Sequence, residues 1–371
     1  MATAYYIDST NSRHTLDPEV HALTMTGDDS LFLDVTGSIR AFGHRADGVR
    51  FENAPADGGL TSITVNGVIA SQHASGIHTL EGGAKITIGT SGRVYGHIYG
   101  IQLSGSNVVT NHGIIISDGT GIGQALGAAG QMTLINTGTI GAVDAPYIAV
   151  GGSDSADVVI NHGRIIGRVL LGSGDDVYHG QLGTVTAEIN LGSGNDAAFG
   201  GAGNETFITE AASVEQDVID GGRGTDHIVL LGIQDMIIDL RITTQQAIGN
   251  GFFQILNVEN ITTNNGADKI TGSDVANVLK AGQGQDTLLG GRGNDTLDGG
   301  EGNDTLDGGE GIDTADFSTD WWITVDLTLS GGQNTGHGTD TLIGIENLSG
   351  SAGADRFTGS SGANRDRKSV V

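Results

Sequence analysis

Aspartate recurs every nine residues over residues 281–317, a segment made mostly of glycine with a small or apolar residue two positions after each acid. Glycine has no Cβ atom, so each turn can aim backbone carbonyl oxygens and one carboxylate at the same point. Such oxygen ligands select Ca²⁺, whereas Mg²⁺ keeps its waters in a tighter octahedron. The spacing therefore predicts several Ca²⁺ sites. The candidate ligands in this segment are Gly282, Gly284, Asp286, Gly291, Gly293, Asp295, Gly300, Gly302, Asp304, Gly309, Gly311 and Asp313.

The nine-residue period begins at Thr263 and continues to Asp316 without a slip. Its sixth positions are Asp268, Asn277, Asp286, Asp295, Asp304 and Asp313, and its eighth positions are Ile270, Leu279, Leu288, Leu297, Leu306 and Ala315. By strand alternation the eighth position faces the interior. Two units make one full coil, which places Asp286 beneath Asp304 and Asp295 beneath Asp313. Carboxylates stacked at about the strand spacing of 4.8 Å repel each other unless a cation lies between them.

The same glycine–acid turn occurs singly at Asp176, Asp196 and Asp226, and the period resumes after residue 350 with Asp355. These acids are further candidate Ca²⁺ ligands. Isolated glycine–aspartate turns also connect strands in proteins that bind no metal. For the single turns, both interpretations therefore stand. Asn277 is neutral and Ala315 is small, so we expect their units to be weaker.

The N-terminal half carries a longer period, marked by Gly67, Gly92, Gly113, Gly138 and Gly163, at intervals of 25, 21, 25 and 25 in residue number. Each unit has two short β-branched runs around an Asn/Gly turn and no helical periodicity. This pattern predicts an all-β fold, a right-handed parallel β-helix that continues into a calcium-binding parallel β-roll. A β-sandwich is the alternative.

The repeats suggest seven segments. They are a lead-in (1–30), parallel β-helix coils (31–170), a transitional β-solenoid with isolated glycine–acid turns (171–262), a nonapeptide β-roll (263–316), a spacer (317–349), the start of a second nonapeptide block (350–365) and a tail (366–371). We expect a short irregular or helical piece at residues 245–248. Codons for Asp366–Val371 match a common sequencing adapter, so we expect a non-native tail and a missing natural C-terminus. A short native basic tail is the alternative.

The formal net charge is -27, with 44 acidic against 17 basic residues. An anionic surface repels nucleic acid and anionic lipid, so we expect calcium as a partner and no nucleic acid. The absence of cysteine excludes disulfides and thiolate metal sites. The N-terminus lacks the pattern of a secretory signal peptide. No run of residues approaches the ~20 apolar residues of a membrane span.

The stretch GGRGNDTLDGGEGNDTLDGGEGIDTADF (290–317) resembles the RTX, or haemolysin-type, calcium-binding nonapeptide repeat. The insert DFSTDWWITVDL…GTDTLIGIENLSGSAGADRF is similar to the spacers found between RTX blocks, and the resemblance covers residues 171–365. It implies a β-roll with Ca²⁺ between coils. It also implies type I secretion through an uncleaved C-terminal signal, and therefore an extracellular protein without a cleaved N-terminal signal peptide.

Catalytic motifs are weak. The chain has no HExxH zinc-protease motif, and the glycine-rich stretch 118–127 lies in a predicted coil without βαβ context. LDPEVH (16–21) has the residue types of an alginate-epimerase motif in another order, and we expect His112 and His162 to stabilise turns. We therefore expect a secreted structural or adhesive protein without an active site, with a surface polysaccharide or host surface as partner. The alternative is a polysaccharide lyase or epimerase, which would need acids with Lys, Arg or Tyr on one β-helix face.

Overall fold

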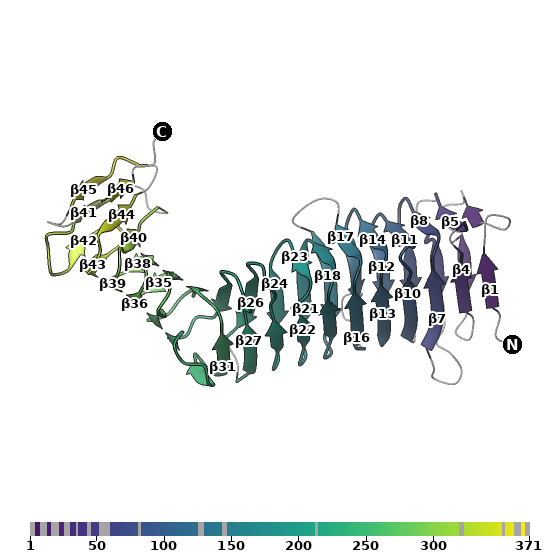
Figure 1. Ribbon diagram of the computed structural model, residues 1–371, viewed down its shortest axis with the longest axis horizontal. Coiled ribbons are helices and arrows are strands. Elements are labelled where there is room, and N and C mark those ends of the chain that lie inside the picture. The colour runs from purple at the N-terminus through teal and green to yellow at the C-terminus, as the bar shows by residue number, and fades with distance from the viewer. Residues whose placement is uncertain are drawn as a thin grey trace. The chain divides into compact units, whose positions relative to one another are not determined.

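The computed structural model describes residues 4–7, 13–15, 22–25, 30–34, 36–42, 46–51, 60–80, 83–124, 130–142, 147–211, 214–318, 323–350, 353–359 and 365–367. All regular elements in these ranges are strands, and the chain divides into two compact units, Met1–Glu205 and Thr206–Val371 (Figure 1). Within the same ranges no helix has the length and apolar character needed to span a membrane.

The first unit is a three-sided parallel β-helix in which each sheet takes every third strand (Figure 1). Its sheet A holds β1 (Ala4–Ile7), β4 (Ser30–Leu33), β7 (Leu60–Val65), β10 (Gly83–Ile88), β13 (Asn107–Asn111), β16 (Met132–Asn136), β19 (Val158–Asn161), β22 (Val177–His179) and β25 (Ala197–Phe199). Sheet B holds β2 (Arg13–Thr15), β5 (Ser38–Ala41), β8 (Val68–Ser71), β11 (Arg93–Gly96), β14 (Ile114–Ser117), β17 (Thr139–Ala142), β20 (Arg164–Ile166) and β23 (Thr184–Val185). Sheet C holds β3 (Leu23–Met25), β6 (Val49–Phe51), β9 (Ile77–Thr79), β12 (Tyr99–Leu103), β15 (Thr120–Gln124), β18 (Ile148–Ser153), β21 (Arg168–Gly172) and β24 (Ile189–Gly192).

Strand register in sheet B confirms the repeat lengths. Arg93, which directly follows the marker Gly92, pairs with Val68 after Gly67 and with Ile114 after Gly113. Thr139, which follows Gly138, pairs in turn with Ile114 and with Arg164 after Gly163. The marker glycines are thus exactly one coil apart. Because these pairs are parallel, the β-sandwich alternative is wrong.

The interior of the first unit is a set of side-chain stacks, one side chain per coil. In sheet A, Ile63, Ile86, Val109, Leu134 and Val159 follow one another in register and are completely buried. Buried asparagines form a second stack: Asn111 Nδ2 donates to Asn136 Oδ1 at 2.8 Å, and Asn136 repeats the bond to Asn161 at 2.8 Å. Each amide oxygen also accepts the N–H of the glycine two residues on, so asparagine fixes these corners, and His112 Nδ1 adds a hydrogen bond with Thr137 Oγ1 at 2.6 Å.

The second unit is dominated by two parallel sheets, here called roll sheets 1 and 2. Roll sheet 1 holds β26 (Thr206–Glu210), β28 (His227–Leu231), β32 (Asn260–Thr262), β34 (Val278–Lys280), β37 (Thr296–Asp298), β40 (Thr314–Asp316), β44 (Asn347–Ser349) and β46 (Arg365–Arg367). Roll sheet 2 holds β29 (Ile237–Asp239), β33 (Lys269–Thr271), β36 (Thr287–Arg292), β39 (Thr305–Glu310), β43 (Thr339–Ile343) and, antiparallel at its edge, β42 (Gln333–Asn334). Smaller pairings join β27 (Gln216–Asp220) with β31 (Gly251–Leu256) and β30 (Gln246–Ile248), β35 (Gln283–Gly284) with β38 (Glu301–Gly302), and β41 (Thr324–Asp326) with β45 (Arg356–Thr358).

The roll repeats with every second nonapeptide. Leu288 pairs with Ile270 and Leu306 in roll sheet 2, and Leu297 pairs with Leu279 in roll sheet 1. All five side chains are at most 1% exposed. The eighth position of each nonapeptide therefore forms the core, as its alternation predicts.

The expectation of an irregular or helical piece at residues 245–248 is wrong, because Gln246–Ile248 is a strand antiparallel to β31. Gly249, at φ 57°, turns the hairpin in the left-handed region that glycine adopts without strain. At the C-terminal end, Arg365–Arg367 pairs with β44 and thus includes the first two residues of the expected tail. Residues 368–371 lie outside the described ranges, as does the LDPEVH segment.

Candidate calcium-binding site

The nine predicted acids share one place in the fold, the residue immediately before a strand. They are Asp176 (β22), Asp196 (β25), Asp226 (β28), Asp268 (β33), Asp286 (β36), Asp295 (β37), Asp304 (β39), Asp313 (β40) and Asp355 (β45). All except the half-exposed Asp355 are at most 2% exposed. Asp355 accepts the amide of Ile323 at 3.1 Å beside the separate β41–β45 pair, so it lies apart from the stacks described next.

Acids at the start of the roll sheet 2 strands form a continuous stack, here called the 286 column. The backbone N–H of Asp268 donates to Asp286 Oδ1 at 2.7 Å, and that of Asp286 donates to Asp304 Oδ1 at 2.8 Å. Asp304 continues the pattern to Asp340 Oδ1 at 2.9 Å. One oxygen of each carboxylate thus caps the amide of the preceding coil, which fixes the acids in register.

A second stack, the 295 column, runs along roll sheet 1. The backbone N–H of Asn277 donates to Asp295 Oδ1 at 2.8 Å, and that of Asp295 donates to Asp313 Oδ1 at 2.8 Å. Asp313 then donates to Glu346 Oε2 at 2.9 Å. Asn277 is the neutral rung, and its side-chain amide donates to the carbonyl oxygen of Glu259 at 2.6 Å.

The first unit contains a shorter version, the 176 column. The N–H of Asp157 donates to Asp176 Oδ1 at 2.6 Å, and the N–H of Asp176 donates to Asp196 Oδ1 at 2.8 Å. Both oxygens of Asp157 have a donor, because Oδ1 accepts the amide of Met132 at 2.5 Å and Oδ2 accepts the amide of Ser153 at 2.7 Å. Two of the isolated acid turns noted in the sequence, Asp176 and Asp196, are therefore stacked rather than isolated.

Each column leaves carboxylate oxygens buried without a donor. Among the described residues, no hydrogen bond reaches Oδ2 of Asp176, Asp286, Asp295 or Asp313. An ionised carboxylate oxygen removed from water without a partner is costly. These oxygens fit a hard cation, whose charge would offset the cost and whose coordination shell needs such ligands.

Glycine makes room for the carboxylates. Gly300 has a φ of 81°, and a Cβ atom at this position would overlap the carbonyl oxygen of Gly282 in the coil below. A Cβ atom at Gly299 would lie 2.5 Å from Oδ2 of Asp304. The predicted glycines come shortly before the acids in the chain. Gly282, Gly293, Gly300 and Gly311 lie between strands, whereas Gly284, Gly291, Gly302 and Gly309 lie in β35, β36, β38 and β39.

Burial is the largest influence on the pKa values of the acids in the columns. It raises these values and so favours the protonated form when no cation is present. It raises the pKa of Asp286 to about 7, with smaller upward contributions from the charges of Asp304 and Asp268. It raises the pKa of Asp295 to about 6 and that of Asp304 to about 6. The hydrogen bond from the neighbouring amide lowers each pKa but does not offset the burial. In the 176 column, burial raises the pKa of Asp176 to about 8, with the charge of Asp196 adding to it.

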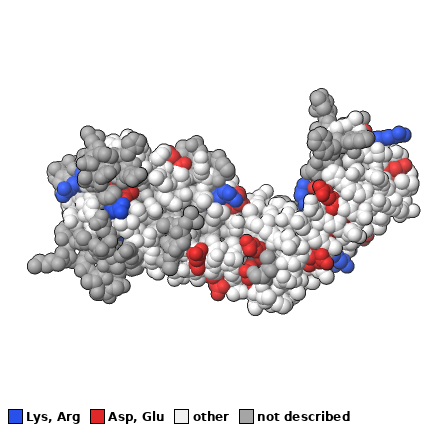
Figure 2. Space-filling model, turned by 180° about the vertical axis from the view of Figure 1, so that it is seen from behind, with Lys and Arg blue, Asp and Glu red and all other residues white. Residues whose placement is uncertain are grey.

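The columns offer oxygen ligands and little else. Within the described part of the chain, no group of three or more His, Cys, Asp or Glu residues is arranged to hold a metal. Further ligands would have to be the backbone carbonyls of the glycine turns, which is the donor chemistry of a Ca²⁺ site. Figure 2 shows a face that is mostly uncharged, with acidic side chains in small separate groups, because the acids of the columns are buried.

Sequence reasoning missed four acids: Asp157, Asp340 and Glu346, which belong to the columns, and Glu259, whose Oε2 accepts the backbone N–H of Asp226 at 2.8 Å. Asp340 lies in the expected spacer, but Gly336, Gly338, Asp340 and Leu342 keep the G-x-G-x-D-x-U spacing of the repeat. Glu259 and Glu346 occur in the similar tetrapeptides VENI and IENL, each directly before a strand. The recurrence of that tetrapeptide was the available signal.

Fold and site together define a calcium-binding β-roll protein. Comparison with protein families matches the RTX calcium-binding nonapeptide repeat (4 copies) at residues 188–211, 215–230, 259–288, 280–315 and 338–365. The chain thus carries RTX calcium-binding nonapeptide repeats together with a parallel β-helix. No curated protein matches the chain.

Proposed function

We propose that the 286 and 295 columns hold Ca²⁺ between coils and that the second unit folds when calcium is supplied. The observation that carries this proposal is the set of buried Oδ2 atoms without a donor, repeated in register at Asp286, Asp295 and Asp313. The glycine turns would contribute carbonyl ligands, and Asp176 with Asp196 would form a corresponding site in the first unit.

Without calcium the columns oppose folding, because ionised carboxylates must be buried in stacks. Extracellular calcium modules bind with dissociation constants of about 10⁻⁴–10⁻³ M. A calcium concentration ten times the dissociation constant stabilises each site by about 1.4 kcal/mol. Several sites in one stack act together, so a chain unfolded in calcium-poor cytosol would fold outside the cell.

This behaviour supports a secreted protein, exported by type I secretion, with a structural or adhesive role at a surface. RTX repeats are typical of secreted proteins. A polysaccharide-active enzyme with an RTX export module is the second candidate. Screening the purified protein for release of unsaturated uronides from acidic polysaccharides separates the two functions.

The calcium proposal is tested by titrating the metal-free protein with Ca²⁺ while far-UV circular dichroism reports β structure. A cooperative gain of β signal is expected with Ca²⁺, and a much smaller gain with Mg²⁺ at the same concentration. An unchanged spectrum across the titration would overturn the proposal.

A further inference from the structure

The last acid of the 286 column, Asp340, lies in a nonapeptide that departs from the repeat at one position. Residues 335–343, TGHGTDTLI, keep two glycines, the aspartate and the leucine of the pattern G-G-x-G-x-D-x-U-x. Only the first position differs, where Thr335 stands in place of glycine. The unit belongs to the hairpin of β42 and β43 at the edge of roll sheet 2.

The backbone of this unit continues the stack of the coils before it. A Cβ atom at Gly338 would overlap the carbonyl oxygen of Gly302, just as one at Gly302 would overlap that of Gly284. Gly336 has a φ of 114°, in the same left-handed region as the 81° of Gly300. The glycine turn is therefore retained, and the side chain of the first residue is what distinguishes the unit.

The first residue of a nonapeptide lies against Oδ2 of its own aspartate. A Cβ atom there would be 2.4, 2.5 and 2.6 Å from that oxygen in the pairs Gly290–Asp295, Gly299–Asp304 and Gly308–Asp313, respectively. Glycine brings no donor to this place, and Oδ2 of Asp295 and of Asp313 has none among the described residues. The first position therefore decides what meets the oxygen that we assign to calcium.

Thr335 fills this place with a hydroxyl group. Its side chain is buried, and its Oγ1 donates to Oδ2 of Asp340. Oδ1 of Asp340 accepts the backbone N–H of Asp304, so both carboxylate oxygens have a protein donor. Burial raises the pKa of Asp340, and the hydrogen bond from Thr335 opposes this more than any other contact does. The hydroxyl group thus offsets the cost of burying the carboxylate, as a cation would at the other rungs.

The threonine at the other end of the column is oriented differently. Thr263 stands five residues before Asp268, but its Oγ1 donates to the carbonyl oxygen of Ala281 at 3.0 Å. A threonine at the first position therefore caps the acid when its hydroxyl group faces Oδ2, as that of Thr335 does.

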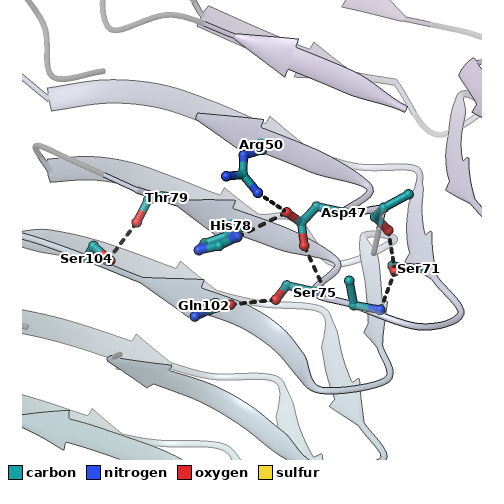
Figure 3. Close-up of polar contacts among 10 residues, drawn as sticks. Asp47, Arg50, Ser71, Ser75, His78, Thr79, Gln102 and Ser104 are labelled. Atoms are coloured by element: carbon teal, nitrogen blue, oxygen red, sulfur yellow. Dashed lines mark hydrogen bonds and ion pairs between the residues drawn. The ribbon is translucent and has the colours of Figure 1, made fainter. Parts of the chain in front are cut away.

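A buried aspartate with protein partners on both oxygens also occurs in the first unit. Asp47 is 2% exposed, and its Oδ1 accepts the backbone N–H of Ser75 at 3.0 Å. Arg50 Nη1 donates to its Oδ2 at 3.3 Å, and His78 Nδ1 lies 3.0 Å from the same oxygen (Figure 3). Protein groups can therefore satisfy a buried carboxylate in this chain, and at Asp340 a threonine does so.

We propose that Thr335 ends the calcium stack of the 286 column. Its hydroxyl group takes the place of an ion at Asp340, and the hairpin of β42 and β43 caps the column without metal. The proposal rests on the proposed function, because it assumes calcium at the preceding rungs. It adds which residue limits the number of ions, and it makes the last coil of roll sheet 2 depend on a hydrogen bond of the chain itself.

Counting bound ions tests the cap. The full chain is dialysed to equilibrium against millimolar Ca²⁺, and calcium per chain is measured by atomic emission. The variant Thr335→Ala removes the hydroxyl group and reproduces the pair Ala281–Asp286, in which Oδ2 has no donor among the described residues. We expect this variant to bind one ion more per chain than the wild type. Thr335→Gly, which restores the repeat as GGHGTD, should show the same gain.

Two further variants are controls. Thr335→Ser keeps the hydroxyl group and should bind as many ions as the wild type. Thr339→Ala truncates an exposed threonine of the same hairpin and should also leave the count unchanged. Circular dichroism in calcium checks that each variant is folded.

Thermal unfolding separates the cap from a merely structural hydrogen bond. The midpoint of metal-free Thr335→Ala should fall, because a buried carboxylate loses its donor. Saturating calcium should raise the midpoint of this variant more than that of the wild type, because it binds the additional ion. An unchanged ion count in Thr335→Ala and Thr335→Gly would overturn the cap, and so would a lost ion, which would make the hydroxyl group a ligand. A wild type that binds no calcium would overturn the proposed function and the cap with it.

Discussion

The backbone N–H of Asp286 donates to the carboxylate of Asp304, one coil further along the chain, at a distance of 2.8 Å. The side chain that serves the candidate metal site thus also caps the preceding coil. Oδ1 of Asp286 accepts the backbone N–H of Asp268, and Oδ2 of Asp286 has no donor among the described residues, so this carboxylate has one structural and one available oxygen. Folding and metal binding therefore use the same residues.

The metal-free roll should become more stable as the pH falls. Burial raises the pKa of Asp286 to about 7 and that of Asp304 to about 6, above the unfolded value of about 3.9. The folded state then binds protons more tightly, so the stabilisation is full below about pH 4 and is lost as the pH rises through 6 to 7. Urea unfolding of protein freed of metal should show a higher midpoint at about pH 5 than at about pH 8. A lower midpoint at the acidic pH would contradict the pKa shifts.

Calcium affinity should depend on pH in the opposite sense, because protons compete for the same oxygens. The variant Asp304→Asn separates the effect of the charge on the stability of the metal-free roll from its effect on calcium affinity. Removing the charge should stabilise the metal-free roll, because a neutral side chain no longer carries the cost of burying an ionised carboxylate, and should weaken calcium by about tenfold as one charged ligand is lost. Thermal unfolding with and without Ca²⁺ measures both. Glu310→Gln, whose side chain is 81% exposed, is the control and should change neither quantity.

Asn277→Asp should turn the neutral rung of the 295 column into an acidic one. Its backbone N–H would still donate to Asp295 Oδ1, now 2.8 Å away, but a buried charge would face Asp295, and the hydrogen bond to the carbonyl oxygen of Glu259 would be lost. We expect a less stable metal-free protein and a larger stabilisation by saturating calcium, both read from urea midpoints. Equal calcium stabilisation in the variant and the wild type would show that position 277 lies outside the metal sites.

Leu297→Ala tests the core of the roll without touching the ligands. The side chain is completely buried between Leu279 and Ala315. Truncating a buried leucine costs about 2–5 kcal/mol. Denaturant unfolding in saturating calcium should show this loss. Ile312→Ala, which truncates a side chain that is 55% exposed, should change the free energy of unfolding by less than about 1 kcal/mol.

The periodic parts of the structure were predictable because the spacing of the repeats in the sequence equals the spacing of paired residues in successive coils. The spacings of Gly67, Gly92 and Gly113 became the coil lengths, and the position of Leu288 predicted the core. Acids that cap an amide in the same way but depart from the nine-residue sequence pattern were missed. Glu259 accepts the amide of Asp226 with a longer side chain than aspartate, and Asp340 follows an insertion. The hairpin at Gln246–Ile248 was missed because such a short strand carries too few side chains to show alternation.

The two units can lengthen in different ways. In the β-helix a chain segment returns to the same sheet only after a whole coil, so a duplication must copy a complete coil, such as the stretch from Arg93 to Gly113, to keep every side chain on its face. In the roll, half a coil carries the same glycine turn, acid and core residue as the other half. Inserting one nonapeptide therefore moves every later unit to the opposite sheet without changing what that sheet presents. A gene could add to or shorten the roll in these half-steps, and the number of acidic rungs could drift between related chains while the architecture stayed the same.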